Sequence, residues 1–177
     1  MDENKKGYFF TLDAVLGLLV LVIGVVLIAS SYVKSPQSAQ VEFLSDDLLN
    51  FFFNVKVKDL NNPYAGIGGQ LWNQGEITDG DNSLLQQIGE FYTLNKLDLA
   101  EKFVQNVSFG AVPGQFYYEM WIDGKLIYPR NPTETHIKSK DKTNLLLTSK
   151  ILTFGIINKT TSNAWGPYKA EVFVWEK

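Results

Sequence analysis

Few side chains in this sequence are of the types that carry out catalysis or bind metal ions. His136 is the only histidine, and the absence of cysteine excludes disulfides, thiol catalysis and zinc thiolate sites. A histidine that acts as a base or a metal ligand needs partners, and the sequence around His136 offers none. We therefore expect His136 at the surface of a polar loop over residues 129–142, and we expect no catalytic residue, no metal site and no cofactor.

Two acidic patterns have structural explanations. Asp46 and Asp47 are adjacent on a predicted helix, so they point apart and suit a solvated face. Residues 79–82 (Asp-Gly-Asp-Asn) supply oxygen atoms of the kind that calcium prefers, but they do not match the twelve-residue calcium loop. A turn before a helix is predicted instead, because Ser83 and Gln86 have the spacing of a capping box.

Two short patterns are acceptors for N-glycosylation. They are Asn106-Val107-Ser108 and Asn158-Lys159-Thr160, and they matter only if this part of the chain lies outside the cell. Asn158 follows a predicted strand and is the more exposed candidate, whereas Asn106 lies near a predicted helix end.

The clearest pattern lies at the N-terminus. Lys5, Lys6 and Gly7 precede a stretch, residues 8–33, in which 20 of 26 residues are hydrophobic. As a helix this stretch is about 39 Å long, which exceeds the roughly 30 Å of a hydrocarbon core. Asp13 is its one acidic residue, and such a carboxylate either lies near the lipid headgroups or pairs with a cation. The two lysines predict a cytoplasmic N-terminus.

This pattern resembles the N-terminus of archaeal type IV pilin-like proteins. The resemblance covers Lys5-Lys6-Gly7, the segment from Tyr8 to Asp13 and the unbroken apolar helix after it. It implies a class III signal peptide that a prepilin peptidase removes after Gly7, which makes Tyr8 the first mature residue. It also implies that the exposed helix packs against the same helix of other subunits, with Asp13 neutralising a neighbour's new amino terminus.

The register differs from that of the bacterial relatives. Gly7 lies three residues before Phe10 rather than directly before it. The sequence therefore does not determine which peptide bond the peptidase cleaves. Gly17, Gly24 and Ser31 recur every seven residues and form a strip of small residues that lets helices approach closely. A removed secretory signal peptide and a plain single-pass anchor are the competing interpretations of the N-terminal segment.

The remainder of the chain predicts an α+β fold of short helices followed by about four antiparallel strands. Pro36 marks a break after the apolar helix, residues 61–82 are rich in Gly, Asn and Asp and read as a loop, and Asp123-Gly124 is a strong hairpin signal. The expected helices cover residues 41–52, 83–92 and 97–107, and the expected strands cover 116–122, 125–128, 145–157 (bent near 149–150 or Gly155) and 170–175.

Composition limits the function. With 24 aromatic residues and a mean hydropathy of -0.06, the chain is neither a disordered tail nor a polytopic transporter, and a net charge of -3 gives no reason to expect nucleic acid.

We expect a cytoplasmic leader (1–7), a transmembrane and assembly helix (8–35) and an extracellular head (36–177). The expected function is a non-enzymatic subunit of a surface filament, with the membrane, the prepilin peptidase, the assembly machinery and further copies of itself, joined through residues 8–35, as partners. The alternative is a monomeric, membrane-anchored domain that binds or senses a ligand.

Overall fold

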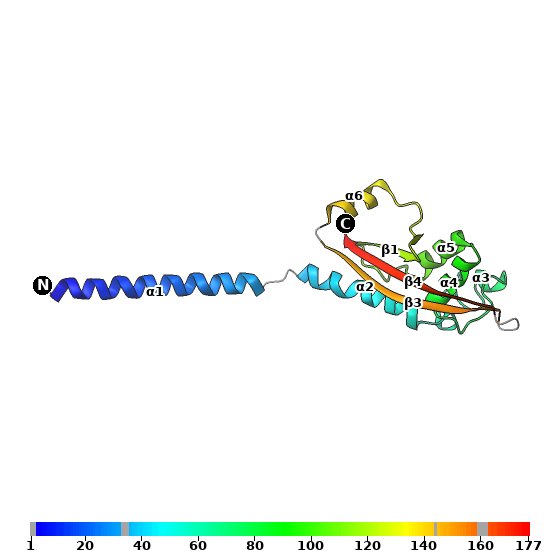
Figure 1. Ribbon diagram of the computed structural model, residues 1–177, viewed down its shortest axis with the longest axis horizontal. Coiled ribbons are helices and arrows are strands. Elements are labelled where there is room, and N and C mark those ends of the chain that lie inside the picture. The colour runs from blue at the N-terminus through cyan, green and yellow to red at the C-terminus, as the bar shows by residue number, and fades with distance from the viewer. Residues whose placement is uncertain (1–2, 33–35, 144, 159–162) are drawn as a thin grey trace. The chain divides into compact units, whose positions relative to one another are not determined.

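The computed structural model describes most of the chain (Figure 1). It places the backbone of residues 3–32, 36–143, 145–158 and 163–177, and the side chains of residues 13–28, 43–143, 145–157 and 163–177. The chain divides into two compact units, Met1–Ala39 and Gln40–Lys177. We call the second unit the head.

The first unit consists mainly of α1 (Glu3–Tyr32), which runs without interruption. The predicted long N-terminal helix is therefore confirmed. The large apolar side chains of its described part, from Val15 to Ile28, are 50–68% exposed in the single chain. Among the residues that the structure describes, no helix is both long and apolar enough to cross a membrane.

A second helix, α2 (Pro36–Asn54), begins at the predicted break. Proline is well suited to the first position of a helix, because the N–H that it lacks would have no helical partner there. The predicted apolar side of this helix is confirmed where side chains are described, since Leu48, Leu49 and Phe52 are all buried.

The helices of the head follow the sequence pattern closely. After α2 come the 3-10 turn η1 (Val57–Asp59), α3 (Gln70–Asn73), α4 (Leu84–Thr93) and α5 (Leu97–Val107). The predicted loop over 61–82 is confirmed except for the four residues of α3. At the start of α4 the Ser83 hydroxyl accepts a hydrogen bond from the Gln86 backbone N–H, and the Gln86 side chain accepts one from the Ser83 backbone. The predicted capping box is thus confirmed.

A four-stranded antiparallel sheet completes the head. Its strands are β1 (Phe116–Ile122), β2 (Lys125–Tyr128), β3 (Leu146–Asn158) and β4 (Asn163–Glu176), in the spatial order β2-β1-β4-β3. Asp123 and Gly124 both adopt positive φ (49° and 78°), as a tight hairpin requires, so the predicted β1–β2 turn is confirmed. The pairing of β3 is irregular between Thr153 and Gly155, at the second of the two predicted bends.

The two faces of the sheet are buried in different ways. On the inner face, Met120, Val172 and Val174 are fully buried and belong to one core with α2, α4 and α5. On the outer face, Glu119 and Trp175 are also buried, although neither belongs to that core. A further element therefore covers part of the outer face.

That element is α6 (Glu134–Lys142), which we had expected to be part of a polar loop over 129–142. The prediction was wrong because the segment is polar overall but places a few residues against the sheet. The chain passes from β2 to β3, which lie at opposite edges of the sheet, so α6 crosses over the strands between them. Figure 1 shows α6 apart from α4 and α5 and close to the end of β4.

Candidate functional site

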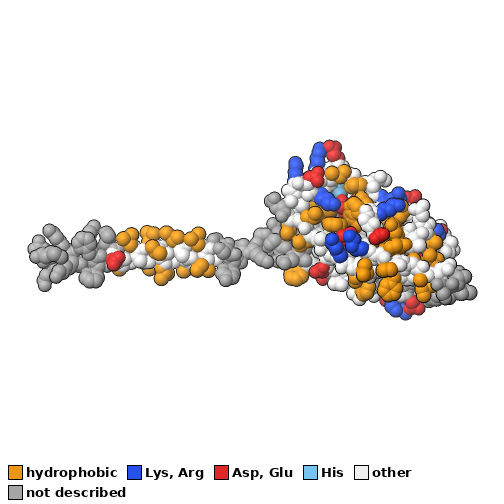
Figure 2. Space-filling view, in the orientation of Figure 1, with side chains coloured by type: hydrophobic (Ala, Val, Ile, Leu, Met, Phe, Trp, Pro, Cys, Tyr) orange, Lys and Arg blue, Asp and Glu red, His pale blue; other side chains and the backbone are white. Residues whose placement is uncertain are grey.

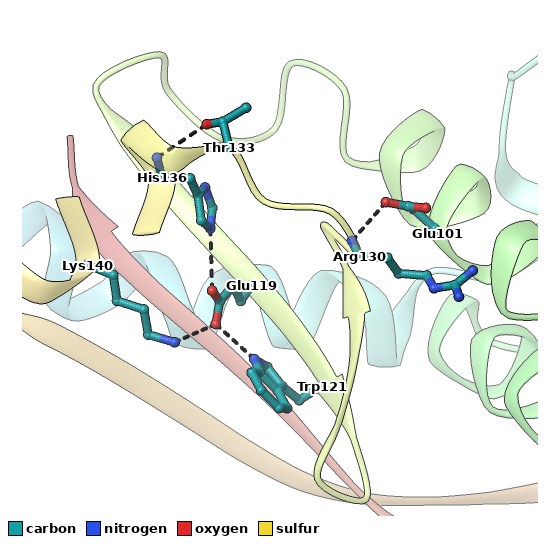
Figure 3. Close-up of polar contacts among 7 residues, drawn as sticks. All are labelled: Glu101, Glu119, Trp121, Arg130, Thr133, His136 and Lys140. Atoms are coloured by element: carbon teal, nitrogen blue, oxygen red, sulfur yellow. Dashed lines mark hydrogen bonds and ion pairs between the residues drawn. The ribbon is translucent and has the colours of Figure 1, made fainter. Parts of the chain in front are cut away.

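A buried carboxylate lies at the centre of the outer face of the sheet. The Glu119 side chain on β1 is 6% exposed, and its Oε2 accepts hydrogen bonds from Lys140 Nζ (2.5 Å) and Trp121 Nε1 (2.9 Å) (Figure 3). Burying a charge without a partner costs several kcal/mol, whereas a paired and hydrogen-bonded charge is tolerated. Lys140 on α6 therefore supplies the charge that allows Glu119 to remain inside.

The second group that faces Glu119 is His136, which is buried and not at the surface as expected. Its Nε2 lies 3.4 Å from Glu119 Oε1, and its ring packs against the rings of Tyr117 and Trp175, with centroids 4.7 Å away in both cases. Burial lowers the pKa of His136 below its ordinary value, and the nearby carboxylate offsets only part of this effect. The imidazole is therefore neutral at pH 7.

The tautomer of His136 follows from the same contact. A nitrogen lone pair aimed at a carboxylate is repelled, so the hydrogen is favoured on Nε2, although this N–H is not aligned well enough for a hydrogen bond. Figure 3 shows the other ring nitrogen directed away from Glu119. Nδ1 is thus left as a hydrogen-bond acceptor on the far side of the ring.

The ammonium group of Lys140 also lies over three aromatic rings. Its Nζ is 5.1 Å from the ring centroid of Phe173, 5.4 Å from that of Trp175 and 5.7 Å from that of Trp121. Each such contact contributes roughly 0.5–1 kcal/mol at a partly exposed site. We call the set of Glu119, His136 and Lys140, with the rings around them, the α6 clamp.

Further contacts hold the segment before and within α6. The Arg130 backbone N–H donates to Glu101 Oε1 (2.8 Å, Figure 3), and the Arg130 guanidinium pairs with Asp98. Thr133 caps α6, because its hydroxyl accepts a hydrogen bond from the His136 backbone N–H. The Ser139 hydroxyl donates a hydrogen bond to the backbone carbonyl of Glu176 on β4. The segment 129–142 is thereby attached to α5 at one end and to the sheet at the other.

The contacts of the clamp have a structural explanation. The charge of Glu119 is balanced by Lys140, and burial keeps His136 neutral. Within the described ranges, no three His, Cys, Asp or Glu residues lie close enough to hold a metal ion. The clamp fixes α6 on the sheet and presents one imidazole nitrogen beside it.

Signals for α6 were present in the sequence. Thr133 is a good N-cap residue, Glu134 lies in the first turn, and Lys140 and Lys142 lie in the last turn, which is the charge order that a helix dipole favours. The i,i+4 pair of Glu134 and Lys138, at 2.5 Å, adds a further signal. The position of Glu119 opposite His136 has no such signal, because it depends on how distant segments pack.

The predicted assembly residues lie along α1. Asp13 is exposed, and a Cβ added at Gly17 or Gly24 would meet no atom within 4 Å. Figure 2 shows apolar side chains along the described part of α1, with one acidic side chain at the start of that part. Ser31 is in the helix, but its side chain lies outside the described residues, as do the side chains of Lys5, Lys6 and Tyr8; the backbone of Gly7 also belongs to α1.

The two predicted glycosylation acceptors differ. The Asn106 side chain donates to the Lys102 carbonyl at 2.8 Å, and Ser108 of the same pattern is buried, with its hydroxyl 2.5 Å from the Tyr118 hydroxyl. In the folded head, a glycosylating enzyme therefore has poor access to the Asn106-Val107-Ser108 pattern. Asn158 ends β3, and its side chain lies outside the described residues.

Fold and site together define an α+β domain with a four-stranded antiparallel sheet, preceded by a long apolar helix. No family model, no curated protein and no solved structure matches this chain.

Proposed function

We propose that this chain is a subunit of an archaeal type IV pilus-like surface filament. In this proposal the leader (1–7) is removed at the membrane, α1 joins the helices of other subunits in the filament core, and the head lies outside the cell. The head would carry any N-glycan, at Asn158 in preference to Asn106. Residence in a membrane before assembly is inferred from the amino-acid sequence of residues 8–33.

The observation that carries the proposal is the apolar surface of α1. Twelve large apolar side chains between Val15 and Ile28 are at least 50% exposed, and this stretch contains no charged residue. A water-exposed surface of this kind is unstable, so the helix needs lipid or other helices around it. The pilin-like residues before it, from Lys5 to Asp13, favour other copies of the same helix.

N-terminal processing tests the proposal directly. We expect intact-mass measurement and N-terminal sequencing of the native protein to place Tyr8 at the start. An unprocessed protein that begins at Met1 would contradict the filament proposal and favour the monomeric anchored domain. A start between residues 29 and 32 would instead indicate a secretory signal peptide.

Asp13 provides a second test. We expect Asp13→Ala to be processed and inserted normally but to be excluded from filaments, because its carboxylate no longer neutralises a neighbour's amino terminus. Asp47→Ala is the matched control, since Asp47 is an exposed acidic residue on the surface of α2. Normal filament formation by Asp13→Ala, counted by electron microscopy, would refute the assembly role of this carboxylate.

A further inference from the structure

A cavity of about 360 Å³ opens beside the α6 clamp. It lies between the segment before β1, the end of β2 and the chain that leads into α6. Its walls are aromatic rings and prolines, with a few polar side chains among them. We call it the tyrosine cavity, and its lining includes Gly114, Tyr117, Tyr118, Tyr128, Asn131 and His136.

The aromatic walls are fixed in place. The ring of Tyr128 stacks on that of Tyr118, with centroids 4.9 Å apart and planes inclined by 28°. The Tyr118 hydroxyl is held by Ser108 at 2.5 Å, and Tyr118 itself is buried. Tyr128 is only half-buried, so part of its surface is left for a ligand. A preformed wall of this kind lowers the entropy cost of binding.

The polar groups of the cavity suit hydroxyl groups. His136 lines the cavity, and with its hydrogen on Nε2, which faces Glu119, the Nδ1 of its neutral ring is a hydrogen-bond acceptor. Asn131 is exposed and offers both a donor and an acceptor. Among the described residues that line the cavity none is Asp or Glu, and Lys177 carries the one charged side chain. The lining therefore offers too little positive charge for a phosphate-rich ligand.

We propose that the tyrosine cavity binds one pyranose ring of a carbohydrate. The C–H faces of a sugar pack against tyrosine and proline rings, while its hydroxyls bond to an imidazole acceptor and an amide. The volume lies at the lower end of the range for small-ligand pockets, which fits a single ring. The proposal does not depend on the role of the chain in a filament.

Saturation-transfer NMR on the full chain tests the proposal. The protein is kept in solution with a detergent that has no sugar headgroup, and the probes are methyl glycosides of glucose, galactose, mannose and their 2-acetamido forms. We expect saturable binding of at least one of them. We expect Asn131→Ala to weaken it about fivefold to tenfold, as the loss of one or two hydrogen bonds would.

A blocking variant and a control complete the design. Gly114 lines the cavity, and a Cβ added there meets no atom within 4 Å, so the first atom of a larger side chain is accommodated; we expect Gly114→Leu to obstruct the cavity and abolish binding. Asn50→Ala, at an exposed position on α2, should bind like the wild type. The absence of saturable binding to every glycoside, or binding that neither cavity variant changes, would overturn the proposal. Binding of a proline-rich peptide instead, with the same dependence on Gly114, would also overturn it.

Discussion

Glu90 should make the head less stable as the pH rises, and replacing it with glutamine should remove this effect. Glu90 lies on α4, is 4% exposed and accepts one hydrogen bond from Asn82 Nδ2 (3.1 Å). Burial raises its pKa from 4.5 to about 7, and the negative charge of Asp79 adds to the shift. A carboxyl group with a raised pKa holds a proton in the folded state that the unfolded chain has already released.

The direction and size of the pH effect on stability follow from the difference in proton binding between the folded and unfolded states. Between pH 4.5 and about 7 the folded state binds more protons than the unfolded state, so stability falls as the pH rises through this range and then levels off. A rise of the Glu90 pKa from 4.5 to about 7 corresponds to roughly 3 kcal/mol of stability. We expect Glu90→Gln to match the wild type near pH 4 and to exceed its free energy of unfolding by about 2–3 kcal/mol at pH 8. Glutamine keeps the oxygen that Asn82 needs.

Urea unfolding of the full chain at pH 4, 5, 6, 7 and 8, followed by tryptophan fluorescence, measures this difference. All four tryptophans lie in the head, so the signal reports on that unit. His136 acts in the opposite direction, because its lowered pKa costs stability as the pH falls below about 6.5. The comparison of Glu90→Gln with the wild type cancels that contribution.

Glu134→Gln is the matched control for this prediction, since the Glu134 side chain is 80% exposed in the first turn of α6. It should leave the dependence of stability on pH close to that of the wild type. If Glu90→Gln shows the same pH dependence as the wild type between pH 5 and 8, the buried carboxyl group does not have a raised pKa in the folded head.

Three further changes test the packing of the head, each by urea unfolding at pH 7. A Cβ at Gly89 would lie 2.1 Å from the ring of the buried Trp165, so Gly89→Ala should cost at least about 2 kcal/mol and expose the indole, seen as a red shift in fluorescence. Ser83→Ala removes the cap of α4 and should cost about 1 kcal/mol, while Ser83→Asp should retain most of the stability. Lys140→Met leaves Glu119 buried without its cation and should cost about 3 kcal/mol, and the double variant with Glu119→Gln should recover much of the loss.

Local signals predicted most of the fold because they act within a few residues. The capping box at Ser83, the Asp123-Gly124 turn and the apolar spacing of residues 97–107 each correspond to an element in the structure. The α6 clamp could not be predicted in this way. Glu119 and His136 meet only because β1 and α6 pack together, and sequence spacing does not show which face of a strand a distant helix will cover.

The two units of the chain bury their apolar residues to different extents. This difference supports the proposed assembly of α1 with other copies of the chain. In the head, α5 buries one side, with Ala100, Phe103 and Val104 fully inside and polar residues facing out. A helix of that kind needs one neighbour. In α1 the exposed apolar side chains include consecutive residues from Leu18 to Ile23, which point in all directions around a helix with 3.6 residues per turn. One packing surface cannot cover such a helix; in the proposed function lipid surrounds it first, and copies of itself surround it in the filament.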